Sequence, residues 1–370
     1  MTDSAVFQLA SRVRSTSGTA SYARLVDTAW RRHSKRQLVT LDAGDVAMDE
    51  IPRRASVLVH LGVNDFSSFE FCHRASKSRP DIQKSILVHD PPLFPVSKFG
   101  LIEHISVVRA GRGIRRLANS FFGEMLDRRI VLEHDRWITM SYIGKTALEA
   151  YLVRLGIRAP RVDVLSHALY GEPFRQSSCG DDRMPLTFGF FGHIAPSKGL
   201  ETLIDAFNLV LAEQGVDKTA KLRIAGQPDS PHSARLLRRE QAKVRRLNLE
   251  EHIEFLGGIR EDKISDFFRS IDVLALPYLR SNFSASGPLH LSLTYGVPVI
   301  CSSSPYFSEA VGASGVGLLA KQADPREWAD VMSSFIADKS LRCRLAAQVS
   351  VAQQRNSWSE MVAHLERVLS

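Results

Sequence analysis

The chain has 370 residues, of which 44% are hydrophobic and 24% charged, and its formal net charge is +8. Because a single hydrophobic core stops growing at about 250–300 residues, this length predicts two domains, and the composition excludes a disordered or fibrous protein. The positive charge favours an anionic partner, which leaves nucleic acid, a phospholipid surface and a charged substrate open.

The N-terminal segment predicts a protein that stays in the cytoplasm. Residues 1–18 lack the basic start and the long apolar core of a secretory signal. No run of about 18 apolar residues that could cross a bilayer occurs in the sequence. Four widely spaced cysteines fit neither a zinc site nor a disulfide framework, so we interpret them as reduced and structural; they are Cys72, Cys179, Cys301 and Cys343.

The first half of the chain alternates short apolar runs with helical patterns, which predicts a parallel sheet covered by helices. Gly18 and Thr19 follow the first strand and open a helix, so they can approach a phosphate group. His89 closes an apolar strand, which places it at the carboxyl edge of the sheet. A histidine that only caps the strand is the alternative. The expected strands are 5–11, 37–43, 55–62, 85–90, 136–141 and 161–167, and expected helices include 19–34 and 146–156.

Residues 104–133 predict a basic amphipathic helix, because arginines alternate with apolar residues at three- and four-residue spacing. Such a helix can lie on an anionic leaflet, so we expect peripheral contact with the inner face of a membrane. A domain helix with a solvated basic face is the alternative. The residues assigned to this membrane or acceptor surface are Arg109, Arg112, Arg115, Arg116, Phe121 and Phe122.

Turn-forming and polar residues cluster over 171–185 without periodicity, which predicts the join between two domains. We expect an N-terminal domain over 1–172, a C-terminal domain over 186–352, and a final helix over 353–370 that packs back toward the N-terminal domain. The expected strands of the second half are 186–192, 221–226, 253–257, 272–278, 298–303 and 315–320, with helices over 201–215 and 260–271 between them.

Residues 188–207, FGFFGHIAPSKGLETLIDAF, predict an anion site. An apolar strand leads to Gly192, a turn carries His193 and Lys198, and a helix begins after Gly199. The unpaired amides and the positive dipole end of a helix N-terminus attract anions, and a nearby ammonium group adds to this attraction. We therefore expect a phosphorylated ligand, with a solvated loop lysine and a turn histidine without a ligand as the alternatives.

Further segments of the second half read HIEFLGGIREDKISDFFRSIDVLALPY and YGVPVICSSSPYFSEAV, and a last helix lies near Trp358. Together with residues 188–207, they resemble the retaining glycosyltransferases of family 4. The segments STSGTASYARLV, ILVHDPP and WITMSYIGKTAL extend a weaker resemblance into the first half. The resemblance implies an α/β protein of the GT-B fold, in which two Rossmann-like, doubly wound parallel-sheet domains face each other across a cleft.

The resemblance also implies roles for particular residues. Lys198 stands where the family binds the diphosphate of the donor, and His193 replaces an arginine that usually partners this lysine. His89 stands near the donor sugar and the acceptor, and these three residues are the catalytic candidates. The donor-binding residues that we assign are Gly18, Thr19, Gly192, Gly199, Phe255, Leu256, Tyr278, Ser284, Ser286, Gly287 and Glu309, of which Phe255 and Leu256 hold the nucleobase.

One departure from the family is larger. Phe283 and Leu291 stand where the family has two glutamates separated by seven residues, so neither carboxylate is present. The loop 284–287 keeps small residues before a helix, so its amides and hydroxyls can still hold phosphate, and Glu309 is a candidate to replace a lost carboxylate. A scaffold that has lost donor binding is the alternative.

We therefore expect a glycosyltransferase that transfers a sugar from a nucleotide-diphosphate sugar to a glycan or lipid-linked glycan acceptor, with retention of configuration, in polysaccharide or glycoconjugate biosynthesis. The sequence has no Asp-x-Asp triplet, so we expect neither a metal nor another cofactor. A catalytically silent GT-B scaffold and a sugar-nucleotide epimerase are the alternatives. We expect no nucleic acid partner, because no groove-reading module accompanies the arginines.

Overall fold

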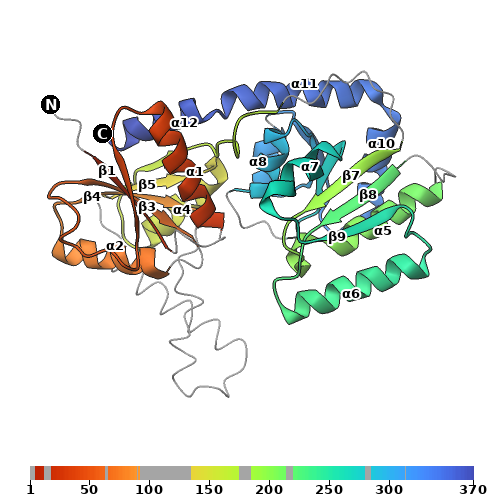
Figure 1. The fold of residues 1–370 in the computed structure, drawn as a ribbon, viewed down its shortest axis with the longest axis horizontal. Helices are drawn as coiled ribbons and strands as arrows, with labels where there is room; N and C mark the ends of the chain where they lie inside the picture. The colour runs from red at the N-terminus through yellow and green to blue at the C-terminus, as the bar shows by residue number, and fades with distance from the viewer. Residues whose placement is uncertain are drawn as a thin grey trace, which may run out of the picture. The chain divides into compact units, whose positions relative to one another are not determined.

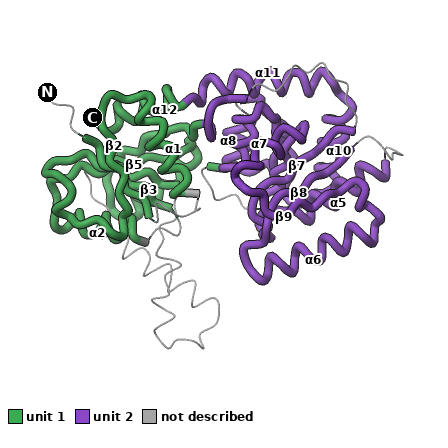
Figure 2. Tube along the Cα trace, viewed as in Figure 1, with its two compact units in different colours: residues 1–168, 282–285, 358–370 green, residues 169–281, 286–357 purple. Residues whose placement is uncertain are grey.

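The computed structural model describes residues 5–11, 18–62, 66–89, 91, 135–174, 185–213, 220–279, 285–312 and 314–370. The chain divides into two compact units, which Figure 2 shows in different colours. Unit 1 comprises residues 1–168, 282–285 and 358–370, and unit 2 comprises residues 169–281 and 286–357. The domain limits drawn from the sequence, at residues 172, 186 and 353, stay predictions.

Unit 1 is built on a parallel sheet whose described strands follow the order β2-β1-β3-β4-β5-β6. Figure 1 shows this sheet together with the helices α1, α2 and α4. Its strands are β1 (Val6–Ala10), β2 (Leu38–Asp42), β3 (Ser56–Leu61), β4 (Gln83–Val88), β5 (Arg136–Thr139) and β6 (Val162–Val164). Its described helices are α1 (Gly18–His33), α2 (Phe66–Ser78), α4 (Tyr142–Arg154) and α12 (Trp358–Val368).

Alternating side chains divide the core of unit 1 between the two faces of this sheet. Leu9 of β1 and Val57 of β3 pack in one cluster with apolar residues of α2 and α4. Leu58 of β3 and Leu87 of β4 pack in another cluster with α1 and α12. Because both faces are covered, the strands read as almost continuous apolar runs.

Unit 2 has a second parallel sheet, whose described strands follow the order β12-β11-β10-β7-β8-β9. Its strands are β7 (Leu186–Phe191), β8 (Ala220–Ala225), β9 (Ile253–Gly257), β10 (Val273–Leu276), β11 (Val299–Ser302) and β12 (Gly317–Ala320). Its described helices are α5 (Leu200–Glu213), α6 (Pro231–Arg246), α7 (Ile264–Arg269), α8 (Gly287–Thr294), α9 (Pro305–Phe307), α10 (Pro325–Ala337) and α11 (Lys339–Arg355), with 3₁₀ turns η2 (Pro196–Lys198) and η3 (Glu261–Lys263) and a π-helical turn η4 (Ser308–Gly312).

The same alternation sets the two layers of unit 2. Phe188 and Phe190 of β7 pack with α5 and α10 in the main cluster, whereas the Phe191 ring packs at a tilt against Phe267 and Phe268 of α7 on the other face. The helices begin where the sequence supplies caps: for example, Ser230 caps α6, with Pro231 in its first turn. The predicted α/β class and the two Rossmann-like parallel sheets are thus confirmed, while the cleft between the domains stays a prediction.

Among the cysteines that the structure describes, one differs from the sequence-based interpretation, and Cys179 lies outside the described residues. Cys72 and Cys301 are buried free thiols, as expected, and burial raises the pKa of the Cys72 thiol to about 12. Cys343, in contrast, is disulfide-bonded, so its interpretation as a reduced residue was wrong. Spacing along the sequence does not show which cysteines the fold brings together.

Candidate functional site

The turn after β7 carries the predicted anion-binding residues and is anchored on the strands to either side. The Gly192 amide donates to the Ala225 carbonyl at 3.0 Å, and the Leu279 amide donates to the Ser197 carbonyl at 2.9 Å. Gly199 ends the turn with φ +67°, and a Cβ there would lie 1.8 Å from the Pro277 carbonyl oxygen. Only glycine therefore allows the start of α5 to approach β10 so closely.

Lys198 and Tyr278, which the sequence singled out separately, are in direct contact. The Lys198 Nζ lies 3.6 Å from the centroid of the Tyr278 ring, which is a cation–π geometry. Tyr278 is buried and packs against Phe307, with ring centroids 5.4 Å apart. A rigid ring thus holds the ammonium group at the carboxyl end of the sheet, just before the N-terminus of α5, where an anion is stabilised.

His193 lies on the exposed side of the same turn. The Asp229 carboxylate lies within electrostatic reach of His193. The pKa of Asp229 is lowered chiefly by a hydrogen bond from Ser233 and, to a much smaller extent, by His193. The Ile194 amide donates to the Gln227 carbonyl at 3.0 Å, which fixes the backbone beside His193. His193 is thus placed at the strand ends, with a carboxylate in its surroundings.

The loop 284–287, which the sequence predicted as a second phosphate contact, leads directly into helix α8. Ser286 caps this helix by accepting from the Leu289 amide at 3.4 Å, and its backbone hydrogen-bonds the phenol of Tyr306. A Cβ on Gly287 would lie 2.9 Å from the Tyr170 hydroxyl oxygen. Two tyrosines therefore enclose the helix start, and burial raises the pKa of Tyr170 to about 12.

Apolar and aromatic side chains, a histidine and one glutamate surround the position in α8 where the family has a glutamate. Leu291 lies in α8 and is half-buried, and the preceding His290 lies 3.2 Å from the Tyr306 hydroxyl through its Nε2. Glu309 lies in the π-helical turn η4, half-buried, and its charge adds to the burial that raises the pKa of Tyr306. Phe283 and Ser284 lie outside the described residues.

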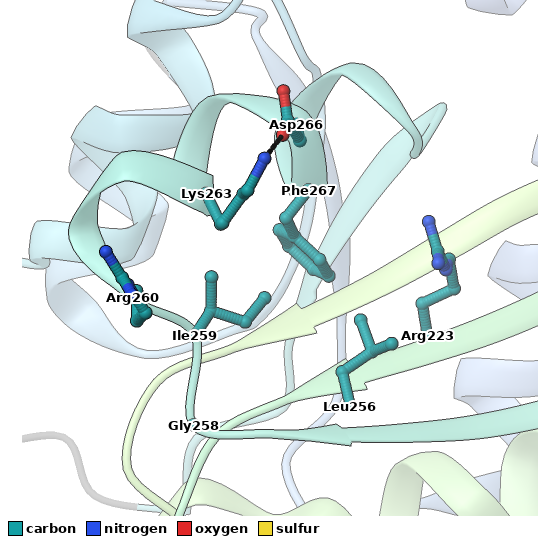
Figure 3. Close-up of a pocket in the computed structure, with 8 residues that line it drawn as sticks. All are labelled: Arg223, Leu256, Gly258, Ile259, Arg260, Lys263, Asp266 and Phe267. Atoms are coloured by element: carbon teal, nitrogen blue, oxygen red, sulfur yellow. Dashed lines mark hydrogen bonds and ion pairs between the residues drawn. The ribbon is translucent and has the colours of Figure 1, made fainter.

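A pocket of about 380 Å³ opens beside the predicted nucleobase residues, between the end of β9 and α7 (Figure 3). Apolar side chains of Leu256, Ile259 and Phe267 line it, and Lys263 and Asp266 form an ion pair of 3.1 Å at its wall. Phe255, the other predicted base contact, packs against the main core of unit 2 instead. The remaining lining residues are Arg223, Gly258 and Arg260.

In unit 1, His89 directly follows β4, at the carboxyl edge of the sheet as predicted, and its amide donates to the Leu61 carbonyl at 2.9 Å. Its Nε2 lies 3.1 Å from Nδ1 of His60, a buried residue of β3 that sequence reasoning missed. Tyr22 packs edge-on against His89, with ring centroids 5.6 Å apart. The signal in the sequence was a single imidazole inside the apolar strand ASVLVHLG. Gly18 begins α1, followed by the half-buried Thr19.

The predicted membrane or acceptor surface lies outside the described residues: Arg109, Arg112, Arg115, Arg116, Phe121 and Phe122. Among the helices that the structure does describe, none is both long and apolar enough to span a bilayer. Within the same part of the chain, no group of three or more histidine, cysteine, aspartate or glutamate residues is arranged to hold a metal ion.

Comparison with protein families gives a match within unit 2. Residues 185–338 match the family described as glycosyl transferases group 1. A D-inositol 3-phosphate glycosyltransferase of Corynebacterium glutamicum is 25% identical over 215 residues, which cover 57% of this chain and 50% of that protein. A phosphatidyl-myo-inositol mannosyltransferase of Mycobacterium leprae is 28% identical over 234 residues, or 63% of this chain and 55% of that protein. The chain thus spans about half the length of these relatives.

Solved structures resemble the chain over almost its whole length. A sucrose-phosphate synthase from Thermosynechococcus elongatus has a TM-score of 0.68 and 16% identity, and the match covers 99% of this chain and 98% of that one. HepE of Anabaena, solved in complex with UDP, has the same TM-score and identity and covers 99% of both chains. At this level of identity the likeness concerns the fold alone.

Proposed function

We propose that the chain transfers a sugar from a nucleotide-diphosphate sugar to a glycan or lipid-linked glycan acceptor, and the match of residues 185–338 to the glycosyl transferases group 1 family supports this proposal. The observation that carries the proposal is the Lys198 ammonium held 3.6 Å from the Tyr278 ring centroid, beside the N-terminus of α5. A fixed positive charge at that place matches the negative charge that grows on a departing nucleoside diphosphate.

In this proposal the turn after β7 binds the diphosphate. Lys198 supplies a full positive charge. The first amides of α5 direct the positive ends of their dipoles toward the same phosphate oxygens. The hydroxyl of Ser286 accepts from Leu289 and keeps its own hydrogen, so it can donate to a phosphate oxygen. The resemblance to retaining enzymes supports a reaction that keeps the anomeric configuration of the transferred sugar.

The pocket beside β9 is our candidate for the nucleobase. Its volume of about 380 Å³ lies in the range of small-molecule sites, and Leu256 and Phe267 offer apolar surfaces for a flat ring. Arg260 lines the same pocket and can donate to base oxygens. HepE, one of the solved structures that resemble the chain, is described as a complex with UDP. This supports a uridine nucleotide as the first donor to test.

The acceptor class is proposed from the names of two relatives. The Mycobacterium leprae relative is named for a phosphatidyl-myo-inositol acceptor, and the Corynebacterium relative for an inositol phosphate. These names support a polyhydroxylated acceptor, either free or linked to a lipid. They are consistent with the peripheral membrane contact that residues 104–133 predict from their sequence.

The test is a screen of uridine, guanosine and adenosine diphosphate sugars by thermal shift and by donor hydrolysis. We expect one nucleotide to stabilise the wild type and Lys198→Ala to lose most of that shift. Lys221→Ala is the matched control, because Lys221 is exposed near the amino end of β8, at the other end of the sheet. If no donor shifts the wild type, or if Lys198→Ala behaves like Lys221→Ala, the proposal fails.

A catalytically silent scaffold is the second candidate, and the observation that favours it is Leu291 in α8 at the place of a family glutamate. This candidate predicts that a nucleotide stabilises the wild type while no donor is hydrolysed and no acceptor is glycosylated. An enzyme predicts slow donor hydrolysis and faster turnover when an acceptor is added. The same screen therefore separates the two.

A further inference from the structure

A pocket of about 520 Å³ opens in unit 1 beside β6, the last strand in the order of the described sheet. Its lining comes from the first residues of β5 and β6, from α4 and from α12. These two helices pack in different core clusters, on opposite faces of the sheet. The pocket therefore lies at the edge of the sheet, where side chains from both layers meet.

Basic side chains from all of these elements converge in the pocket. Four of its lining side chains are cationic and only two are carboxylates, so its surface attracts anions. The fold, and not a run of neighbouring arginines, gathers this charge, because the residues come from four separate segments of the chain. The cations are Arg136, Lys145, Arg161 and Arg367, and the carboxylates are Glu149 and Asp163.

The four cations differ in their partners. Lys145 pairs with Glu149 at 3.6 Å, and the Arg136 guanidinium donates to a carbonyl at the end of α12. Among the residues that the structure describes, the side chains of Arg161 and Arg367 have neither an ion pair nor a hydrogen bond. Like charges that are gathered in one place repel one another, and a bound anion offsets that repulsion.

The size of the pocket and its second carboxylate indicate which kind of anion fits. Its volume of about 520 Å³ lies in the range of small-molecule sites and exceeds what a single phosphate group fills. Guanidinium groups bind phosphate through paired hydrogen bonds. Asp163 has no ion pair with any residue in the described ranges, so its carboxylate can accept hydrogen bonds from hydroxyl groups. A phosphate monoester with several hydroxyl groups matches both kinds of side chain.

The pocket is separate from the predicted transfer site. Arg136 is paired in register with Ser85, and His89 lies four residues beyond Ser85, or about 13 Å along the strand. The first residues of β5 and β6 lie at the amino edge of the sheet, whereas His89 lies at its carboxyl edge, where such sheets bind their substrates. We propose that this pocket is a second ligand site, which binds a phosphorylated polyol, either free or as the headgroup of a lipid. This inference goes beyond the proposed function and does not depend on it.

Titration calorimetry of the full chain at constant ionic strength tests the site. We expect glucose 6-phosphate to bind more tightly than inorganic phosphate, and uncharged glucose not to bind. Arg161→Gln combined with Arg367→Gln should raise the Kd for glucose 6-phosphate at least about tenfold, because two charge-assisted contacts are lost. Arg245→Gln combined with Arg246→Gln, on two exposed arginines of α6, is the matched control and should bind like the wild type. Equal Kd values in the two double variants would overturn the proposal.

A further variant tests the contact with hydroxyl groups. Asp163→Ala removes a negative charge beside the phosphate, so inorganic phosphate should bind more tightly. Glucose 6-phosphate should at the same time lose its advantage over inorganic phosphate, because the acceptor for its hydroxyl groups is gone. If both probes bind more tightly and keep their order, the pocket attracts anions without recognising a polyol, and the proposal is refuted.

Vesicles distinguish a lipid headgroup from a free ligand. Flotation compares pure phosphatidylcholine with nine parts phosphatidylcholine to one part phosphatidylinositol 4-phosphate, whose headgroup is a phosphorylated polyol. Selective binding that is lost in the Arg161 and Arg367 double variant, but kept in the α6 control, assigns the ligand to a lipid. Binding of glucose 6-phosphate without selective flotation assigns a free ligand. If the wild type binds neither, the inference fails.

Separate readouts distinguish this inference from the proposed function. Lys198→Ala should lose the nucleotide-induced thermal shift and yet bind glucose 6-phosphate with the Kd of the wild type. Hydrogen exchange of the wild type should show slower exchange of β6 and α12 amides when glucose 6-phosphate is bound, and this result requires no variant to fold. Protection confined to unit 2, or loss of glucose 6-phosphate binding in Lys198→Ala, would contradict the inference. If no nucleotide shifts the wild type, only the proposed function fails.

Discussion

The position of Lys198 depends on one aromatic ring. A lysine side chain on a surface turn ordinarily samples many rotamers, and ordering it costs entropy each time a ligand binds. The contact with Tyr278, at 3.6 Å from Nζ to the ring centroid, orders the ammonium group in advance. The ring is itself fixed by Phe307, so the order extends into the core of unit 2.

Replacing this ring should weaken donor binding. Tyr278→Leu removes a cation–π contact that contributes about 0.5–1 kcal/mol, so the Kd for the stabilising nucleotide should rise about two- to fivefold. Tyr278→Phe keeps the ring and should stay within about twofold of the wild type. Isothermal titration calorimetry measures both. Equal losses in the two variants would show that the hydroxyl, and not the ring, matters.

Single residues also show what the sequence could not predict. It named Tyr278 and His89 from their places at strand ends, because parallel strands end at one edge, and Lys198 from the turn that joins a strand to a helix. It did not pair Lys198 with Tyr278, since their contact depends on a turn docking onto a distant strand. It missed His60, because one polar residue inside an apolar strand has the pattern of ordinary core.

At the scale of elements, α12 shows that order in the sequence does not decide packing. The helix follows α11 of unit 2 in the chain, yet Met361, Val362 and Leu365 are buried with α1 against the sheet of unit 1. The Glu366 carboxylate accepts a hydrogen bond from Ser34 after α1. An amphipathic helix with one apolar stripe is stable here because the sheet covers that stripe.

Shortening one side chain in this stripe should destabilise unit 1. Leu365 is 1% exposed, so Leu365→Ala should lower the free energy of unfolding of unit 1 by about 2–5 kcal/mol. Val351, in α11, is 40% exposed, and Val351→Ala should change stability by less than about 0.5 kcal/mol. Hydrogen exchange of β3 and β4 amides in urea reports on unit 1 directly. Equal protection in Leu365→Ala and the wild type would contradict the assignment.

The elements themselves were largely predictable. Each of the twelve strands that the structure describes overlaps a stretch expected from its apolar run, because strands buried on both faces leave a continuous pattern. The ends were less certain. The strand expected over 161–167 is only Val162–Val164, and the helix expected over 260–271 is the turn η3 followed by the short α7. Tertiary contacts, which a local pattern does not contain, set those limits.

At the scale of the whole molecule, buried neutral histidines make stability depend on pH. Burial lowers the pKa of His60 to about 3 and that of His167 to about 4, whereas a histidine in the unfolded chain has a pKa near ~6.5. The unfolded chain therefore binds more protons in the interval between these values. The stability contributed by neutral burial is complete above pH ~6.5 and is lost as the pH falls toward about 4.

We therefore expect unit 1 to unfold in mild acid. Each of the two histidines should lower its free energy of unfolding by up to about 1.4 kcal/mol per pH unit between pH 6 and pH 4. Urea titrations at pH 7.5, 6, 5 and 4, followed by hydrogen exchange in each unit, measure the slope. His60→Gln should reduce that slope. A free energy of unfolding that stays constant over this interval would contradict the assigned neutral state.

The discontinuous make-up of unit 1 has a consequence for biosynthesis. The face of its sheet that carries Leu58 and Leu87 is closed in part by α12, which the ribosome makes only after all of unit 2. This apolar surface of the nascent chain therefore stays exposed while unit 2 is translated. We expect chaperones to bind it during that time. Premature termination anywhere before Trp358 would release a polypeptide with this surface uncovered and prone to aggregate.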